Sequence, residues 1–278
     1  MKAMTEDNIT AAALDRLSAA ADPRTREIVS GVIRHLHDCA RELRLTPDEW
    51  KIGIDFLAAA GHLTDDKRNE FILLSDTLGL SALVDLMRHS GEQATASSLL
   101  GPFYREGAPE FELGASIAGE TPGEPLIVRG LIANATGRPL AGATLDIWQA
   151  APNGMYDLQD NAQPEMNMRG RLRSNAAGRY EFRSLKPKSY PVPHDGPVGR
   201  LLDAQGRHPY RPAHIHFMIR ADGYAPLTTA LYIAGDPYIE SDAVFGAKDA
   251  LTVSYRPGER SERGSPDVIE FDFTLAPV

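Results

Sequence analysis

Two histidines separated by one residue mark the segment of this chain best suited to chemistry. His214 and His216 lie in the segment 211–219, whose apolar residues predict a β-strand. Side chains two residues apart on a strand point to the same face, so the two imidazoles are expected to point together. Such a pair can hold a metal ion, but on its own it equally fits two exposed or hydrogen-bonded histidines.

A metal site built on these histidines needs two or more further ligands. The chain has one cysteine, Cys39, and no HExxH motif, so carboxylates and phenols remain as donors. Tyr156 and Tyr190 lie among prolines and glycines, in surroundings typical of loops, where functional groups on a rigid β scaffold often occur. Their setting alone also fits packing residues whose hydroxyl groups lie at the surface.

The first 95 residues have the composition of a helical region. Only 2 of the 20 prolines and 5 of the 24 glycines precede residue 96, and a break near 91–99 indicates a domain boundary. One surface helix is predicted by apolar residues spaced three or four apart, which are Ile28, Val32, Leu36, Cys39 and Leu43.

Local start and stop signals predict further helices. Thr46-Pro47-Asp48-Glu49 combines an N-cap, a proline at the first helical position and a capping-box glutamate, and it opens a helix that Gly61 can end. Runs at 64–78, ending at Gly79, and at 81–89 predict two more helices, while 1–21 is rich in alanine.

After residue 96 the apolar residues recur with period two, which predicts many short antiparallel strands. The alternation is clearest at 269–275, while 126–132 and 143–148 flank a predicted turn at 135–139. No dinucleotide, P-loop, nucleophile-elbow or Cys-X-X-Cys motif is present, which argues against nucleotide binding, serine-hydrolase chemistry and a zinc ribbon. The predicted fold class is α+β, with a helical domain at 1–95 and a mostly antiparallel β-sandwich at 96–278.

Charge and targeting signals limit the possible partners. The chain has 29 Lys and Arg against 38 Asp and Glu, a net charge of −9, which gives no electrostatic footprint for nucleic acid or an anionic membrane. The start MKAMTEDNIT lacks an apolar signal core, and a single cysteine cannot form an internal disulfide. These features predict a cytoplasmic protein that is not a membrane protein and acts on a small molecule or a protein partner.

The order and spacing of several segments resemble the intradiol ring-cleavage dioxygenases, the catechol and hydroxyquinol 1,2-dioxygenases. Besides Tyr156, Tyr190 and the Arg-Pro-Ala-His-Ile-His block at 211–216, the similar segments are 100–109, 146–150, 167–171, 206–208 and 235–238. The resemblance covers most of the chain. It implies one Fe(III) per subunit, held by the side chains of Tyr156, Tyr190, His214 and His216.

The resemblance also implies roles in the reaction with O2. Tyr190 would leave the iron and accept a proton from the substrate, acting as ligand and base in turn. Arg211 would stabilise negative charge on the substrate ring. On a regular strand, however, Arg211 would face away from the two histidines, and an ordinary surface ion pair is the alternative interpretation.

Within this family the chain looks closest to enzymes that cleave hydroxyquinol (benzene-1,2,4-triol) to 3-hydroxy-cis,cis-muconate or its tautomer maleylacetate, with catechol or a substituted catechol as the alternative substrate. The resemblance places Leu73, Asp76, Pro102 and Val244 in the substrate pocket with Arg211. Asp76 would accept a hydrogen bond from the third hydroxyl group of the substrate. A solvated helix residue or a helix-end contact remains the alternative for Asp76.

One position departs from the family, and one region has a further implied role. Ala230 stands where relatives have Gln or His, which removes a polar group that supports the ligands. The N-terminal helices are implied to form a homodimer contact that can hold a phospholipid, although the stripe at 28–43 equally fits packing within one subunit.

Two other classes of function stay open at this stage. One is a Zn(II) or Fe(II) enzyme that uses His214 and His216 with a carboxylate. The other is a non-catalytic binding module, because β-sandwiches host many functions.

Overall fold

The computed structural model describes residues 3–19, 22–65, 67–88, 94–258 and 265–278, and it divides into two compact units, Met1–Ala59 and Ala60–Val278. The division predicted after residue 95 stays a prediction. Part of the composition break at 91–99, and the ends of the predicted runs 1–21 and 81–89, fall on residues outside those described. None of the described helices is long and apolar enough to cross a membrane.

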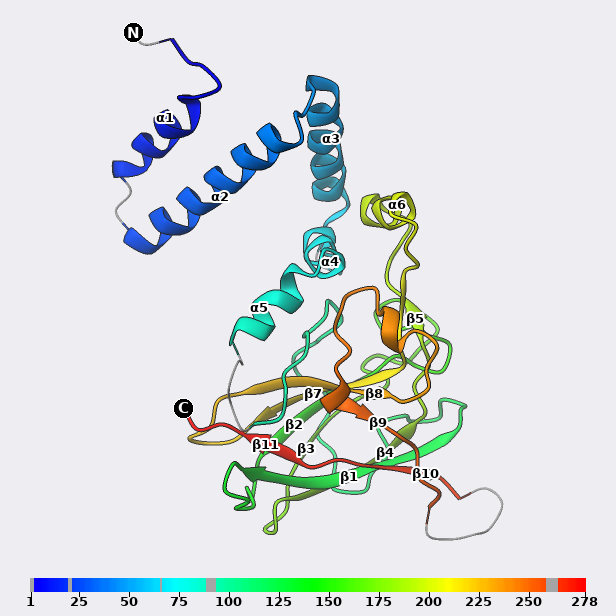
Figure 1. Ribbon diagram of the computed structural model, residues 1–278. Helices are drawn as coiled ribbons and strands as arrows, with labels where there is room; N and C mark the ends of the chain where they lie inside the picture. Colours follow the sequence, from blue (N-terminus) through cyan, green and yellow to red (C-terminus); the bar gives the residue numbers. More distant parts are fainter. Residues whose placement is uncertain (1–2, 20–21, 66, 89–93, 259–264) are drawn as a thin grey trace. The chain divides into compact units, whose positions relative to one another are not determined.

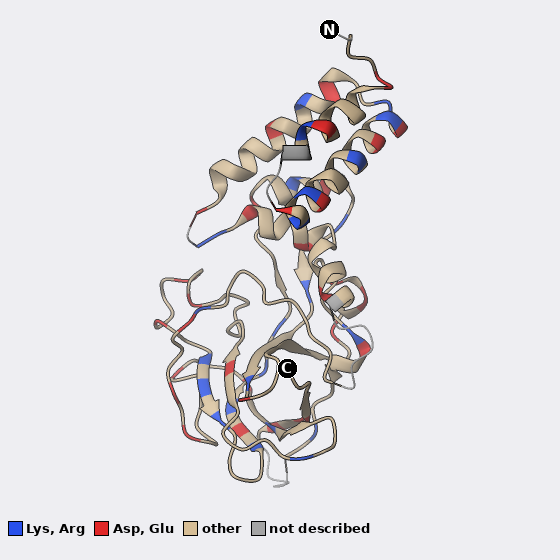
Figure 2. Cartoon of the chain, turned by 90° about the vertical axis from the view of Figure 1, so that its left-hand side faces the viewer, with Lys and Arg blue, Asp and Glu red and all other residues tan. Residues whose placement is uncertain are grey.

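The first unit contains α1 (Ile9–Asp15), α2 (Pro23–Glu42) and most of α3 (Pro47–Leu63). The predicted capping box is present, since Glu49 Oε2 accepts hydrogen bonds of 2.9 Å from both the backbone N–H and the hydroxyl of Thr46. Gly61 does not end the helix, which continues to Leu63. Figure 2 shows basic and acidic residues interleaved along these helices. Several of them form ion pairs, such as Lys51 with Asp55.

The predicted apolar stripe lies on α2 and is exposed in the single chain. Ile28 and Val32 are each about half exposed, and Leu36 is 64% exposed. The stripe is therefore unpaired in the described residues.

The helices of the second unit include α4 (Glu70–Thr77), α5 (Leu80–Arg88) and α6 (Pro197–Ala204). The helix predicted at 64–78 starts later than expected. Asp65 Oδ1 accepts hydrogen bonds from the backbone N–H groups of Lys67 and Arg68 and makes a turn there, and Asn69 then caps α4. Gly79, with φ +77°, follows the helix as predicted.

The described strands of the second unit form three sheets, and the two larger ones face each other (Figure 1). One has the order β10-β1-β11 with β4 also paired to β1, the second has the order β3-β2-β7-β8-β9, and the third pairs β5 with β6. The strands are β1 (Pro125–Asn134), β2 (Thr144–Trp148), β3 (Arg169–Arg173), β4 (Arg179–Leu185), β5 (Tyr190–Pro191), β6 (Tyr210–Arg211), β7 (His214–Arg220), β8 (Leu227–Ile233), β9 (Thr252–Val253), β10 (Asp267–Glu270) and β11 (Phe273–Leu275).

The core of the second unit lies between the two larger sheets. Phe182 and Phe273 from one sheet contact Phe217 from the other, with ring centroids 6.1 and 5.0 Å apart. Most strand pairs are antiparallel, while β1–β10, β1–β11 and β8–β9 are parallel. The predicted α+β class with a β-sandwich is confirmed.

The alternating segment 269–275 forms two strands instead of one. Phe271 and Asp272 interrupt it, because the Phe271 carbonyl accepts a hydrogen bond from Tyr180 Oη (2.8 Å) and Asp272 Oδ1 accepts one from the Leu131 N–H (2.8 Å). The side-chain alternation survives the break, since Ile269 and Phe273 are both buried.

Candidate metal centre and active site

Strand β7 brings the two predicted histidines together. His214 and His216 are buried, and their Nε2 atoms lie 3.1 Å apart. Nδ1 of His214 donates to the Pro212 carbonyl over 2.6 Å, so its Nε2 carries the lone pair. His216 is stacked on the Trp148 ring, with centroids 4.8 Å apart, and its Nδ1 has no hydrogen-bond partner among the described residues.

Two tyrosine hydroxyl groups meet these nitrogens. Tyr156 comes from the loop between β2 and β3, as its surroundings predicted, whereas Tyr190 lies in the short strand β5. The two hydroxyl oxygens are 3.3 Å apart, and that of Tyr190 is 3.4 Å from His214 Nε2. Both rings are buried, so the interpretation of surface hydroxyl groups is wrong for both residues.

Burial makes this cluster a set of neutral donors. It lowers the pKa of His214 to about 3, with help from the nearby Arg211 charge, and lowers the pKa of His216 well below its usual value. It also raises the pKa of Tyr190 and, more strongly, that of Tyr156. Four neutral donor atoms thus converge on one point, each with a lone pair. This arrangement suits a hard cation, because a bound cation would remove the protons of the two phenols and bind them as phenolates.

The tyrosines are needed to complete a metal site here. In the part of the chain that the structure describes, no group of three or more His, Cys, Asp and Glu side chains could hold a metal ion. The alternative in which a carboxylate completes the histidine pair therefore has no candidate residue among those described.

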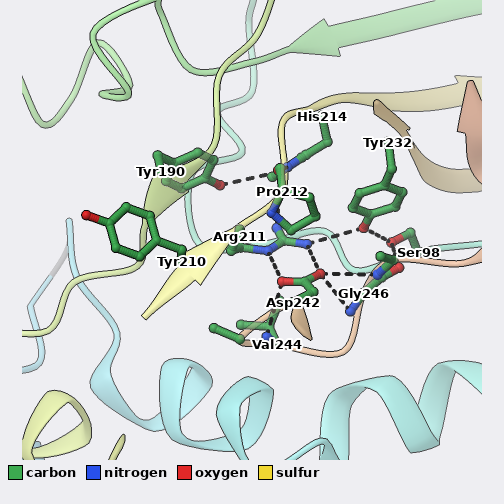
Figure 3. A network of polar contacts seen from close by, with 12 residues as sticks. Ser98, Tyr190, Tyr210, Arg211, Pro212, His214, Tyr232, Asp242, Val244 and Gly246 are labelled. Carbon is green, nitrogen blue, oxygen red and sulfur yellow. Dashed lines mark hydrogen bonds and ion pairs between the residues drawn. The ribbon is translucent and has the colours of Figure 1, made fainter. Parts of the chain in front are cut away.

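Beside the cluster, a buried ion pair fixes the Arg211 guanidinium (Figure 3). Nε and Nη2 of Arg211 each donate to one oxygen of Asp242 over 3.1 Å, Nη2 also donates to Tyr232 Oη, and Nη1 lies 3.1 Å from His214 Nε2. Burial opposes both charges, but their attraction keeps the pKa of Asp242 low and that of Arg211 high. The cation is thus permanent and aimed at the cluster.

Two models of known protein families match this chain, one in its N-terminal part and one in the rest. A family model described as Dioxygenase matches residues 99–277, and one described as Catechol dioxygenase N terminus matches residues 22–96. The chain belongs to the intradiol ring-cleavage dioxygenases. This family depends on non-haem iron.

Individual relatives of this dioxygenase are similar over nearly their whole length. The 6-chlorohydroxyquinol 1,2-dioxygenase of Cupriavidus pinatubonensis is 46% identical, with all of both chains covered. The hydroxyquinol 1,2-dioxygenase of a Rhizobium species is 44% identical over 93% of this chain and 88% of its own. A solved hydroxyquinol 1,2-dioxygenase from Pseudomonas putida DLL-E4 has a TM-score of 0.92 and 44% identity, covering 98% of this chain and 99% of that one.

The dioxygenase has a small cavity next to the cluster, and a larger cleft shares part of its lining. Tyr190 and His216 line the small cavity, and all five residues predicted to contact substrate are also there, namely Leu73, Asp76, Pro102, Arg211 and Val244. Leu73, Pro102 and Phe103 also line a neighbouring cleft of about 560 Å³.

Two expectations about the pocket residues need correction. Strand parity placed Arg211 away from the histidines, but Pro212 and Ala213 separate β6 from β7, so Arg211 is only 4% exposed and faces His214. A surface ion pair is therefore wrong for Arg211. A solvated helix position is equally wrong for Asp76, which is 5% exposed and whose pKa is raised by burial.

Sequence reasoning missed the residues that support the site. Trp148 lies in the segment 146–150 that resembles the family, yet nothing in the sequence shows that Trp148 contacts His216 or that Asp242 contacts Arg211. Ala230, the residue that departs from the family, lies directly opposite His216 in the β7–β8 pairing and is fully buried.

Proposed function

We propose that this chain cleaves hydroxyquinol with O2 between its adjacent hydroxylated carbons, giving 3-hydroxy-cis,cis-muconate or its tautomer maleylacetate. The observation that carries the choice of substrate is the buried Asp76 carboxylate, which lines the same cavity as Arg211 and Val244. The relatives named as hydroxyquinol dioxygenases support it. Catechol is the competing substrate, since a Candida albicans catechol 1,2-dioxygenase is also 38% identical.

We propose that Tyr156, Tyr190, His214 and His216 hold one Fe(III) per subunit. Two phenolates and two neutral imidazoles leave a trivalent ion with one remaining charge and favour Fe(III) over Fe(II). When bound, the iron would be chelated by the two adjacent oxygens of the substrate and would make the ring reactive toward O2.

The residues of the chain would handle protons and charge during the reaction. Tyr190 lines the cavity whereas Tyr156 does not, so Tyr190 is the tyrosine placed to accept a proton from the substrate. Arg211, held by Asp242, places a fixed positive charge at the cavity wall, where it would stabilise negative charge on the ring.

Exchange of Asp76 tests the choice of substrate. In Asp76→Ala the third hydroxyl group of hydroxyquinol loses its acceptor, which costs about 1–3 kcal/mol, so kcat/KM for hydroxyquinol should fall roughly 5- to 150-fold. The value for catechol should change little. Oxygen uptake with each substrate, together with product analysis, measures both.

Leu73→Ala is the control for this test, because it enlarges the same cavity without removing a charge and should affect both substrates alike. If Asp76→Ala lowered the two kcat/KM values equally, Asp76 would not be the residue that selects the substrate. If the unmodified protein preferred catechol, hydroxyquinol would be excluded as the preferred substrate.

We propose further that the protein is a cytoplasmic homodimer whose N-terminal helices form the contact and hold a phospholipid. The exposed stripe of α2 supports the contact, and the single exposed cysteine, Cys39, fits a reducing compartment. Light scattering should give a dimer mass, and Leu36→Glu should give a monomer. A monomer mass for the unmodified protein would refute the homodimer. The absence of phospholipid from organic-solvent extracts of the purified protein would refute the bound lipid.

A further inference from the structure

Arg169, the first residue of β3, is a fully buried cation that the reaction outlined above does not use. Its side chain is 1% exposed, and all of its nitrogens have partners. Nε and Nη2 donate to Asp157 Oδ1 over 2.8 and 2.6 Å, and Nη1 donates to the Phe103 carbonyl over 2.7 Å. A buried charge with this many bonds holds its surroundings in one geometry.

Both hydrogen-bond partners of Arg169 are neighbours of Tyr156. Asp157 is the next residue in the chain, and the Phe103 ring stacks on Tyr156 with centroids 4.6 Å apart. The Arg169 guanidinium carbon itself lies 5.7 Å from the centre of the Tyr156 ring. Tyr156 is therefore held through its backbone neighbour and its stacking partner, with a positive charge over its ring.

Tyr190 has a different environment. It lies on the two-residue strand β5, at the cavity wall, and its nearest cation is Arg211, which is bound to Asp242. The two tyrosines of the cluster are thus not equivalent. Tyr156 is held by its neighbours and does not line the cavity, whereas Tyr190 lines it.

We propose that Arg169 is a positioning residue that fixes Tyr156 and stabilises its phenolate form, so that Tyr156 remains the permanent phenolate ligand. This inference rests on the proposed function, in which Tyr156 binds Fe(III). A positive charge over the ring lowers the energy of the phenolate electrons, so it raises the energy of the tyrosinate-to-Fe(III) charge-transfer band. Removal of that charge should move the band to longer wavelength.

The test compares iron-loaded Arg169→Met and Arg169→Lys with the unmodified protein by visible absorption and by iron titration. In Arg169→Met the band should shift to longer wavelength and the iron affinity should fall about 10- to 100-fold, as for other residues that support metal ligands. Arg169→Lys keeps the charge without the planar fork, so its band should stay closer to that of the unmodified protein while its iron affinity falls.

Arg105→Met is the matched control. Arg105 binds the other oxygen of the same carboxylate, with Nη1 2.6 Å from Asp157 Oδ2, but its side chain is 30% exposed. This variant should keep the band position. It separates the effect of a charge over the ring from the effect of simply loosening Asp157.

The outcomes distinguish this inference from the proposed function. An unmodified protein that shows no tyrosinate band with Fe(III) would overturn both. A normal band in the unmodified protein that is unchanged in Arg169→Met, or that shifts equally in Arg105→Met, would overturn the role of Arg169 alone. If Arg169→Met does not fold, an unchanged iron affinity in Arg169→Lys would overturn it.

Discussion

At the level of single residues, Asp242 determines where the Arg211 guanidinium points. Its two oxygens accept hydrogen bonds from Arg211 and from the backbone N–H groups of Val244, Gly246 and Ala247, at 3.0 to 3.3 Å. One carboxylate therefore joins the cation to the loop that carries the Val244 wall of the cavity. A change at Asp242 should alter the cavity without touching the metal ligands.

Asp242→Asn is expected to lower kcat about 10- to 150-fold. The amide keeps the shape of the side chain but loses the negative charge. Its NH2 group must also face N–H donors that now bind a carboxylate oxygen, and the lost hydrogen bonds cost about 1.5–3 kcal/mol. The tyrosinate band of the iron-loaded protein should persist, because the four donors are unchanged. Steady-state kinetics measure the effect, with Asp203→Asn on the exposed surface of α6 as the control. An unaltered kcat would show that Asp242 does not position Arg211.

Residue spacing predicted some of these side chains and not others. The period of two along a strand placed both imidazoles of His214 and His216 on one face, and the distance of 3.1 Å between their Nε2 atoms confirms this. The same rule failed for Arg211, because Pro212 interrupts the strand. The Arg211–Asp242 contact spans 31 residues of sequence, and no local pattern encodes such a contact.

At the level of elements, the close approach of β1 to the break between β10 and β11 depends on Gly130. A Cβ atom at this position would lie 1.8 Å from the Phe271 carbonyl oxygen, which also accepts the Tyr180 hydroxyl. The glycine is thus required by packing, since no side chain fits between the two backbones.

Gly130→Ala should lower the free energy of unfolding by about 2–4 kcal/mol, because Phe271 must move and its bond to Tyr180 is strained or lost. Gly61→Ala is the control, since its added Cβ would meet the Phe71 ring at 3.8 Å, an ordinary contact, inside α3. It should be neutral or raise stability by about 0.5–1 kcal/mol. Urea denaturation measures both, and equal stabilities for the two variants would contradict this account of the break.

Elements with local signals were predicted well, and those set by tertiary contacts were not. The capping box at Thr46–Glu49 lies within four residues, so the sequence locates the start of α3. The late start of α4 depends on the turn at Asp65, which competes with helix formation. The parallel pairing of β1 with β10 and β11 joins segments more than 130 residues apart, and alternation of apolar residues does not specify a partner.

At the level of the whole molecule, the buried histidines couple folding to pH. The pKa of His214 is about 3 in the folded chain against 6.5 for a free histidine, and that of His216 is also lowered. As the pH falls below about 6.5, the unfolded chain takes up these protons before the folded chain does. The free energy of unfolding therefore decreases with falling pH, with a slope approaching about 1.4 kcal/mol per pH unit for each histidine.

We expect the metal-free protein to lose stability steeply between about pH 6.5 and pH 4. Denaturation at a series of pH values measures the slope, and His214→Gln should reduce it. His35→Gln, which changes an exposed histidine of α2, is the control and should leave the slope as it is. A stability that is independent of pH over this interval would contradict the burial of the two imidazoles as neutral bases.

The visible absorption spectrum of the iron-loaded protein tests the central claim most directly. Tyr156 and Tyr190 bound to Fe(III) should give a coloured protein whose charge-transfer band shifts when hydroxyquinol is added without oxygen, and admission of air should then consume the substrate. Tyr156→Phe and Tyr190→Phe should each weaken the band. A protein that remains colourless after Fe(III) is supplied would contradict tyrosinate ligation, and with it the proposed site.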